Sequence, residues 1–320
     1  MKVAIAGAGM TGAYLYRLLR NRGHEIDIFD RDPGTRCEIT PCAWAASGGF
    51  AELVQAAGVD PGKYLLRPSD YVVIDEVRIK AQVFTFDKPG LIKDLLQGAE
   101  IKYSALDVTY YERTIDATGV SRAFLPVIEE DIILPCVQWR IRAETLLENR
   151  IKLGSIGYAW CFPLGPDEFH IGCGSLISDP RKIMQELGWI GKETVRNTIC
   201  ACTGKVRFTA PQFSLPFVTT EGVWGVGEAI GCVAPLAGDG VVPGMRSVQL
   251  LLQWWDDPLG YTKAIQKEFR WMKPERKVID TLRRNGPLGI KDAWVLRRNS
   301  RRMGMQVSLP EAEKLLKNLR

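Results

Sequence analysis

The N-terminal stretch, residues 2–30, constrains the fold of this 320-residue chain more than any other part of its sequence. A buried strand is expected at residues 2–6, a GxGxxG turn follows at residues 7–12, and a helix then continues to about Arg22. A second strand is expected at residues 25–29, directly before an aspartate. This order is typical of the first unit of a Rossmann-like α/β domain, which binds a dinucleotide at the carboxyl edge of a parallel sheet.

Each glycine of the turn has a physical task in such a site. Gly7 permits the tight turn, Gly9 lets the backbone approach a pyrophosphate, and Gly12 allows the helix to pack on the strand. The phosphates would meet free N–H groups at the helix N-terminus, and Asp30 would accept the ribose hydroxyls. An acid here disfavours the 2′-phosphate of NADP, but the motif fits both NAD and FAD. The residues predicted to bind the dinucleotide in this unit are Gly7, Gly9, Met10, Thr11, Gly12, Asp30 and Arg31.

Two later segments repeat the arrangement of a strand end, small residues and an acid. A strand expected at residues 110–115 runs into the sequence DATG, and a later strand runs into Glu228. A glycine loop at residues 235–244 then leads to a helix expected at residues 246–255. The cofactor contacts predicted for these segments are Ala117, Thr118, Gly119, Glu228, Gly238, Asp239, Gly240 and Val241.

The second glycine loop decides between the cofactors. Two such turns could hold two dinucleotides or one long one, but the second lacks GxGxxG and is not a second nucleotide fold. It fits better as the far wall of a single extended ligand, with the isoalloxazine against it. The helix that begins near residues 243–246 would point its positive end at the flavin and stabilise the negative charge of the reduced ring. The sequence therefore favours FAD.

The middle segment at residues 157–174, GYAWCFPLGPDEFHIGCG, is expected to form two antiparallel strands joined by a turn. Three aromatic residues alternate with small ones, so period two places the rings on one face. Two glycines on the returning strand leave bare backbone for close approach by a ligand or another segment. Spacing alone favours a buried core strand, and the rest of the chain favours a slot for a flat or elongated apolar molecule. The three aromatic residues are Tyr158, Trp160 and Phe162, and the two glycines are Gly172 and Gly174.

This segment matches the YxWxFPx8GxG signature of the geranylgeranyl reductase family residue for residue. The chain also resembles that family in its early GxGxxG, its Pro41-Cys42-Ala43 stretch and its late acid and glycine loop. Members of the family are FAD enzymes that saturate prenyl double bonds. This chain departs from the family pattern at Ala43-Trp44, where Gly-Asp is usual, and at Glu228, where Asp is usual. It is also short for the family.

The resemblance implies an α/β fold. A Rossmann-like FAD-binding domain would carry an inserted antiparallel β-sheet substrate domain and a short helical C-terminal region, as in the aromatic hydroxylases. The expected bounds are 1–75, 88–130 and 205–260 for the FAD-binding domain, 76–87 and 131–204 for the substrate sheet, and 261–320 for the basic C-terminal region.

The resemblance also implies the chemistry. Saturating an alkene needs a hydride, which reduced FAD supplies, and a proton donor, for which Cys42 is the candidate. An inert buried thiol is the competing interpretation of that cysteine. The same fold also accommodates a flavin monooxygenase or a non-catalytic FAD-binding protein. The predicted lining of the substrate pocket is Trp44, Tyr158, Trp160, Phe162, Pro163, Gly172 and Gly174.

The net charge of +5 is unevenly placed, because residues 273–320 contain thirteen Lys/Arg and five Asp/Glu. This basic region could dock an acidic, ferredoxin-like electron donor, rest on anionic lipid headgroups, or simply be a solvated helical face. No pattern favours nucleic acid. With two histidines and no Cys-x-x-Cys, no metal site is expected. The chain lacks an apolar run long enough to cross a bilayer and begins with a strand, so we expect a cytoplasmic protein, with membrane contact at most peripheral.

Overall fold

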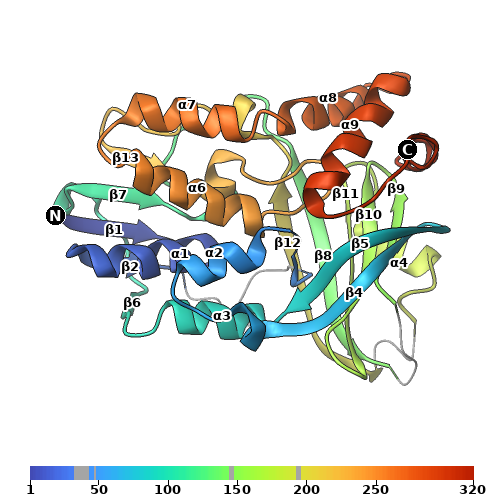
Figure 1. Cartoon of the computed structure of the whole chain (residues 1–320), viewed down its shortest axis with the longest axis horizontal. Helices are drawn as coiled ribbons and strands as arrows, with labels where there is room; N and C mark the ends of the chain where they lie inside the picture. The colour runs from blue at the N-terminus through green and yellow to red at the C-terminus, as the bar shows by residue number, and fades with distance from the viewer. Residues whose placement is uncertain (32–42, 47, 144–147, 192–195) are drawn as a thin grey trace.

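The computed structural model describes residues 1–31, 43–46, 48–143, 148–191 and 196–320. Its strands form two sheets, and the helices after residue 240 lie along one side of both (Figure 1). Within the described residues, we find no helix with the length and apolar character that crossing a membrane requires.

The first sheet is parallel and has the strand order β13-β7-β1-β2-β6. Its strands are β1 (Lys2–Ala6), β2 (Glu25–Phe29), β6 (Ile101–Lys102), β7 (Arg113–Asp116) and β13 (Val223–Gly225). Helix α1 (Met10–Leu19) packs against α3 (Lys88–Leu95) and α6 (Val241–Gln253). These elements bury one apolar core, so the expected Rossmann-like arrangement is present.

Strand β7 is shorter than the sequence predicted. Residues 108–110 form a 3₁₀ turn, because the Asp107 side chain accepts the N–H of Thr109 at 3.0 Å and caps it. Local capping of this kind competes with strand pairing. The strand therefore begins at Arg113 and still ends at Asp116, where the prediction placed the ligand edge.

The second sheet has the order β12-β8-β11-β10-β9-β4-β5-β3 and is antiparallel except where β4 meets β9. Its strands are β3 (Ala45–Ala46), β4 (Leu65–Ile74), β5 (Val77–Phe86), β8 (Ile133–Arg142), β9 (Arg150–Gly154), β10 (Gly157–Pro163), β11 (Glu168–Ser175) and β12 (Thr198–Arg207). The predicted boundary at residue 75 divides a hairpin, because β4 pairs with β5 along nearly its whole length. A tight turn with Asp75 at φ 53° joins them, so both strands belong to this sheet.

The two faces of this sheet are covered by different elements. One face packs against α8 (Met272–Arg283), α9 (Ile290–Ser300) and α10 (Leu309–Asn318). The other face packs against α4 (Pro180–Glu186). The C-terminal helices thus pack over one face of the sheet and share its apolar core (Figure 1).

The described residues also form two further α-helices and seven 3₁₀ helices. They are α2 (Phe50–Ala56), α7 (Pro258–Glu268), η1 (Arg20–Arg22), η2 (Pro61–Tyr64), η3 (Val108–Tyr110), η4 (Gly119–Ser121), η5 (Pro211–Phe213), η6 (Gly227–Ile230) and η7 (Arg301–Met303).

Candidate active site

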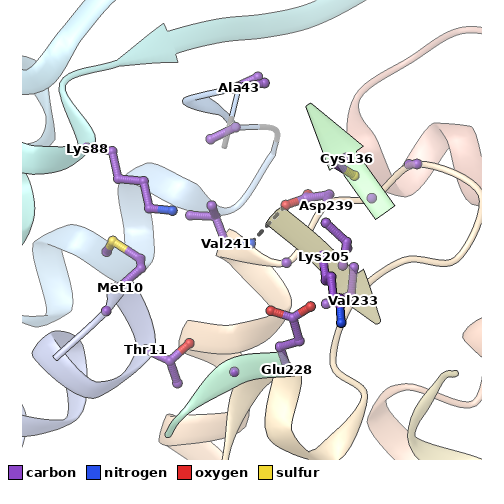
Figure 2. Close-up of a pocket in the computed structure, with 18 of the residues that line it drawn as sticks. Met10, Thr11, Ala43, Lys88, Cys136, Lys205, Glu228, Val233, Asp239 and Val241 are labelled. Carbon is purple, nitrogen blue, oxygen red and sulfur yellow. Dashed lines mark hydrogen bonds between the residues drawn. The ribbon is translucent and has the colours of Figure 1, made fainter. Parts of the chain in front are cut away.

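One cavity of about 1660 Å³ runs from the first glycine turn, past the second glycine loop, to the space beneath the C-terminal helices. Figure 2 shows Met10 and Lys88 on one side of it and Cys136 and Asp239 on the other. Of the predicted cofactor-binding residues, every one except Gly12 lines this cavity. The two turns that the sequence assigned to opposite ends of one ligand therefore open into the same space.

The first glycine turn has the geometry that a pyrophosphate site needs. Gly7 has φ +105°, and a Cβ there would lie 2.4 Å from the carbonyl oxygen of Ala117. At Gly12 a Cβ would lie 1.8 Å from the Gly7 carbonyl oxygen, so only glycine lets α1 pack on the turn. At Gly9 a Cβ would have no heavy atom within 4 Å, so the backbone faces open cavity. The turn thus offers bare backbone and the N-terminus of α1 to an anion.

Asp30 is held at the tip of β2 by backbone hydrogen bonds. Its Oδ2 accepts the N–H of Ala8 at 2.8 Å, and its Oδ1 accepts the N–H of Arg31 at 2.7 Å. Both carboxylate oxygens have further lone pairs for the hydroxyls of a ribose. The carboxylate therefore lies at the cavity edge in a fixed orientation, as its predicted role requires.

The turn after β7 is organised by Asp116, whose side chain is buried. Its Oδ1 accepts the Thr118 N–H at 2.9 Å and the Thr118 hydroxyl at 2.6 Å, and its Oδ2 accepts the N–H of Phe124 at 2.8 Å. Gly119 follows with φ +64°, and Glu228 Oε2 lies 3.3 Å from where its Cβ would stand. Asp116 thus shapes the segment that faces the cavity.

Glu228 is positioned by an arginine that the sequence analysis missed. Its Oε1 accepts the backbone N–H of Arg207 at 2.7 Å, and burial raises the pKa of this carboxyl. The buried Arg207 guanidinium pairs with Asp131 at 3.0 Å and donates to the carbonyls of Val120 and Glu228. Arg207 therefore links the end of β12 to the turn after β7 and to the turn after β13. No motif around residue 207 marks this role, because the partners come from distant segments.

The second glycine loop leads directly into α6. This helix begins at Val241, earlier than the predicted start near residues 243–246, because Pro243 lies in the first turn, where a missing N–H costs nothing. Asp239 Oδ1 accepts the N–H of Val241 at 3.1 Å (Figure 2). Since Gly240 and Val241 line the cavity, the positive end of the helix dipole meets it where the prediction placed the flavin.

The three aromatic residues of β10 share one face, as their spacing predicted. Trp160 and Phe162 are buried in the core beneath the C-terminal helices, and Tyr158 packs beside them. The hydroxyl of Tyr158 donates to the carbonyl of Ala237 at 2.9 Å, which links the eight-stranded sheet to the second glycine loop. All three rings line the cavity.

The predicted bare backbone at Gly172 and Gly174 is covered by the protein itself. The indole of Trp160 crosses Gly172, where a Cβ would lie 2.3 Å from the ring, and donates from Nε1 to Gln138 Oε1 at 3.2 Å. Leu134 and Cys136 side chains cover Gly174. These glycines make room for neighbouring side chains, so the slot over them is absent and neither lines the cavity.

Two further predicted lining residues lie away from the cavity wall. Trp44 is buried edge-on against His170 at a centroid distance of 4.7 Å. The carbonyl of Pro163 accepts the hydroxyl of Thr85 at 2.6 Å. The predicted proton donor Cys42 lies outside the described residues, so its role stays a prediction.

The far part of the cavity, which we call the apolar chamber, contains the three aromatic residues that were predicted to line a substrate pocket, but the rest of its lining was not predicted. It lies between the eight-stranded sheet and the C-terminal helices, and nearly all its side chains are apolar. Its lining consists of Val72, Ile74, Val83, Cys136, Ile151, Leu153, Tyr158, Trp160, Phe162, Leu236, Glu275, Leu296, Ser300, Met303, Met305, Val307, Leu315 and Leu319. Such a chamber suits an apolar, chain-like ligand.

Together, the parallel sheet with its glycine turn and the second sheet sharing its cavity define a Rossmann-like fold with an attached eight-stranded sheet. Residues 5–40 match the family model of the NAD(P)-binding Rossmann-like domain. The chain is 23% identical to an uncharacterized protein of Methanocaldococcus jannaschii, over 87% of this chain and 91% of that protein.

Solved structures confirm the fold that the resemblance implied. A geranylgeranyl bacteriochlorophyll reductase-like protein of Thermoplasma acidophilum superimposes with a TM-score of 0.71 at 16% identity, covering 100% of this chain and 99% of that one. A probable FAD-dependent monooxygenase of Pseudomonas aeruginosa gives a TM-score of 0.57 at 17% identity, covering 88% and 95%. The chain therefore has the fold that a reductase-like protein and a probable monooxygenase share.

Proposed function

We propose that this chain is an FAD-dependent oxidoreductase that saturates carbon–carbon double bonds of a prenyl or related apolar substrate. The observation that carries the proposal is the continuous cavity, in which the half lined by the two glycine turns opens into an apolar chamber. An apolar chamber next to a flavin site would bring an alkene to the ring while excluding water. Bound FAD would supply hydride transfer.

Residues of the chain would bind the cofactor, stabilise its reduced form and hold the substrate. Gly9 and the N-terminus of α1 would hold the pyrophosphate, and Asp30 the ribose. The N-terminus of α6 would stabilise negative charge on the reduced ring. The rings of Tyr158 and Trp160 would hold an isoprene chain by apolar contact.

The first experiment is to purify the chain, record its flavin absorbance and identify co-purifying molecules by mass spectrometry. We expect a yellow protein that carries FAD and retains an isoprenoid-like lipid. The dithionite-reduced protein is then given geranylgeraniol, and its product is analysed by mass spectrometry for added hydrogen. A protein that binds no FAD at saturating concentration contradicts the whole proposal.

A flavin-dependent monooxygenase is the second candidate, favoured by the likeness of the fold to a probable FAD-dependent monooxygenase. Such an enzyme needs oxygen and consumes NAD(P)H faster when its substrate is present. NADPH oxidation that rises with an aromatic substrate, without reduction of geranylgeraniol, would favour it. A flavin-bound protein that does neither would be a non-catalytic FAD-binding protein.

A further inference from the structure

Glu275 is the one carboxyl among the described residues of the apolar chamber. It lies in the first turn of α8 and is only 2% exposed. Its Oε2 accepts the backbone N–H of Leu236 at 3.3 Å, within the second glycine loop. The carboxyl thus lines the chamber next to the loop that we assign to the flavin ring.

The surroundings of Glu275 favour the protonated form of this carboxyl. Burial raises its pKa to about 7, while the N–H of Leu236, the side chain of Asn299 and the charge of Arg302 act in the opposite direction. The described residues offer it no ion pair. The neighbouring Arg276 forms a salt bridge with Asp280 at 3.0 Å and donates a hydrogen bond to the carbonyl of Thr209. A carboxyl placed in this way is partly protonated near neutral pH and can release its proton to a substrate.

The other acidic hydrogens of the chamber are less suited to proton transfer. Burial raises the pKa of the Cys136 thiol to about 12, so this thiol holds its proton too tightly. The hydroxyl of Tyr158 already donates to the carbonyl of Ala237. A general acid works best when its pKa lies near the working pH, and Glu275 meets that condition.

We propose that Glu275 is a catalytic acid of the chamber, donating its proton to a substrate carbon during the reduction. This inference rests on the proposed function. The alkene would accept a hydride from the reduced flavin on one carbon and the Glu275 proton on the other. Its π bond breaks, two C–H bonds form, and the flavin gives up two electrons. The carboxylate then regains a proton from solvent. Glu275 is the described residue best placed for a role that the family resemblance gives to Cys42.

The decisive variant is Glu275→Gln, which keeps the size of the side chain and an oxygen to accept the Leu236 N–H but cannot release a proton. Glu275→Asp keeps the acid, and Glu313→Gln on the exposed face of α10 is the matched control. We expect Glu275→Gln to bind FAD as the wild type does and to reduce geranylgeraniol roughly 10²- to 10⁴-fold more slowly, the usual effect of losing a general acid. Glu275→Asp should recover part of the rate.

A second measurement does not depend on turnover. Infrared difference spectra across a pH titration should show a protonated carboxyl band in the wild type that disappears near pH 7 and is missing from Glu275→Gln. A Glu275 carboxyl that stays ionised at every pH of the titration would overturn the proposal. Equal rates for Glu275→Gln and an active wild type would also overturn it while leaving the reductase assignment intact. If the wild type binds FAD but reduces no prenyl alkene, the proposed function itself fails, and this is seen before any variant is compared.

Discussion

Replacing Gly9 or Gly12 by alanine should separate dinucleotide binding from folding stability. The two glycines lie three residues apart in one motif, but their surroundings are opposite. A Cβ at Gly9 would have no heavy atom within 4 Å and would project into the cavity. A Cβ at Gly12 would lie 1.8 Å from the carbonyl oxygen of Gly7 and 3.4 Å from the Cβ of Ala117.

These distances set the expected energies. At Gly12 the added methyl overlaps a backbone oxygen that cannot rotate away, so α1 must shift, and overpacking of this kind costs about 1–3 kcal/mol of folding free energy. At Gly9 the backbone has φ −69° and accepts alanine without strain, so the apoprotein should keep its stability or gain about 0.4–1 kcal/mol. The same methyl blocks close approach of the pyrophosphate. Losing one charge-assisted hydrogen bond of about 1.5–3 kcal/mol would weaken FAD binding roughly 10- to 100-fold.

Urea unfolding of the apoproteins, followed by circular dichroism, measures the first effect, and quenching of FAD fluorescence measures the second. We expect Gly12→Ala to lower the unfolding midpoint without changing the slope of free energy against urea. Gly9→Ala should unfold like the wild type yet bind FAD weakly. A Gly9→Ala variant with wild-type affinity would refute the reasoning, because the pyrophosphate would then not lie against this turn. A fully stable Gly12→Ala would contradict the described packing.

The remaining predictions concern the second sheet and its charges. Gly172→Ala should displace the Trp160 ring and lower the free energy of unfolding, measured in urea, by about 1–3 kcal/mol. Gly165→Ala should leave the free energy of unfolding unchanged, because a Cβ there would have no heavy atom within 4 Å. Equal losses of stability in the two variants would contradict the placement of the Trp160 ring. Burial lowers the pKa of His170 to about 4, so the unfolded chain binds more protons between pH 6.5 and pH 4, and up to about 3 kcal/mol of stability should be lost as the pH falls through that window. His170→Asn should reduce this acid sensitivity in urea unfolding. The raised pKa of Glu275 acts in the opposite direction, so Glu275→Gln should gain stability relative to the wild type as the pH rises from 4.5 to 7; parallel pH profiles would contradict this.

The nucleotide half of the site could be predicted because its determinants are local. The turn from Gly7 to Gly12 and the carboxylate of Asp30 lie within one short unit, and backbone geometry fixes their relative positions. Errors arose where a neighbouring residue modified the local pattern. Capping by Asp107 shortened β7, and the tolerance of the first helical turn for Pro243 moved the start of α6.

Apart from the three aromatic residues of β10, the chamber half could not be predicted, because its walls come from segments that meet only in the folded chain. Gly172 and Gly174 showed correctly that something approaches the backbone closely, but the period of a strand does not say whether that is a ligand or a tryptophan. Arg207 and Glu275 stand in no recognisable motif. Their roles follow from hydrogen bonds to Glu228 and Leu236, which are 21 and 39 residues away.

This difference between the two halves has a consequence for substrate choice. The nucleotide half presents mainly backbone N–H groups and glycines, whose arrangement depends little on side-chain identity and suits a cofactor that does not vary. The chamber presents side chains from the sheet and from α8, α9 and α10, and lining residues such as Leu296 and Leu315 belong to helices that lie outside the glycine turns. Proteins with the same fold and N-terminal motif can therefore act on different molecules. The C-terminal helices, which carry no motif, are where we expect the substrate of this chain to be determined.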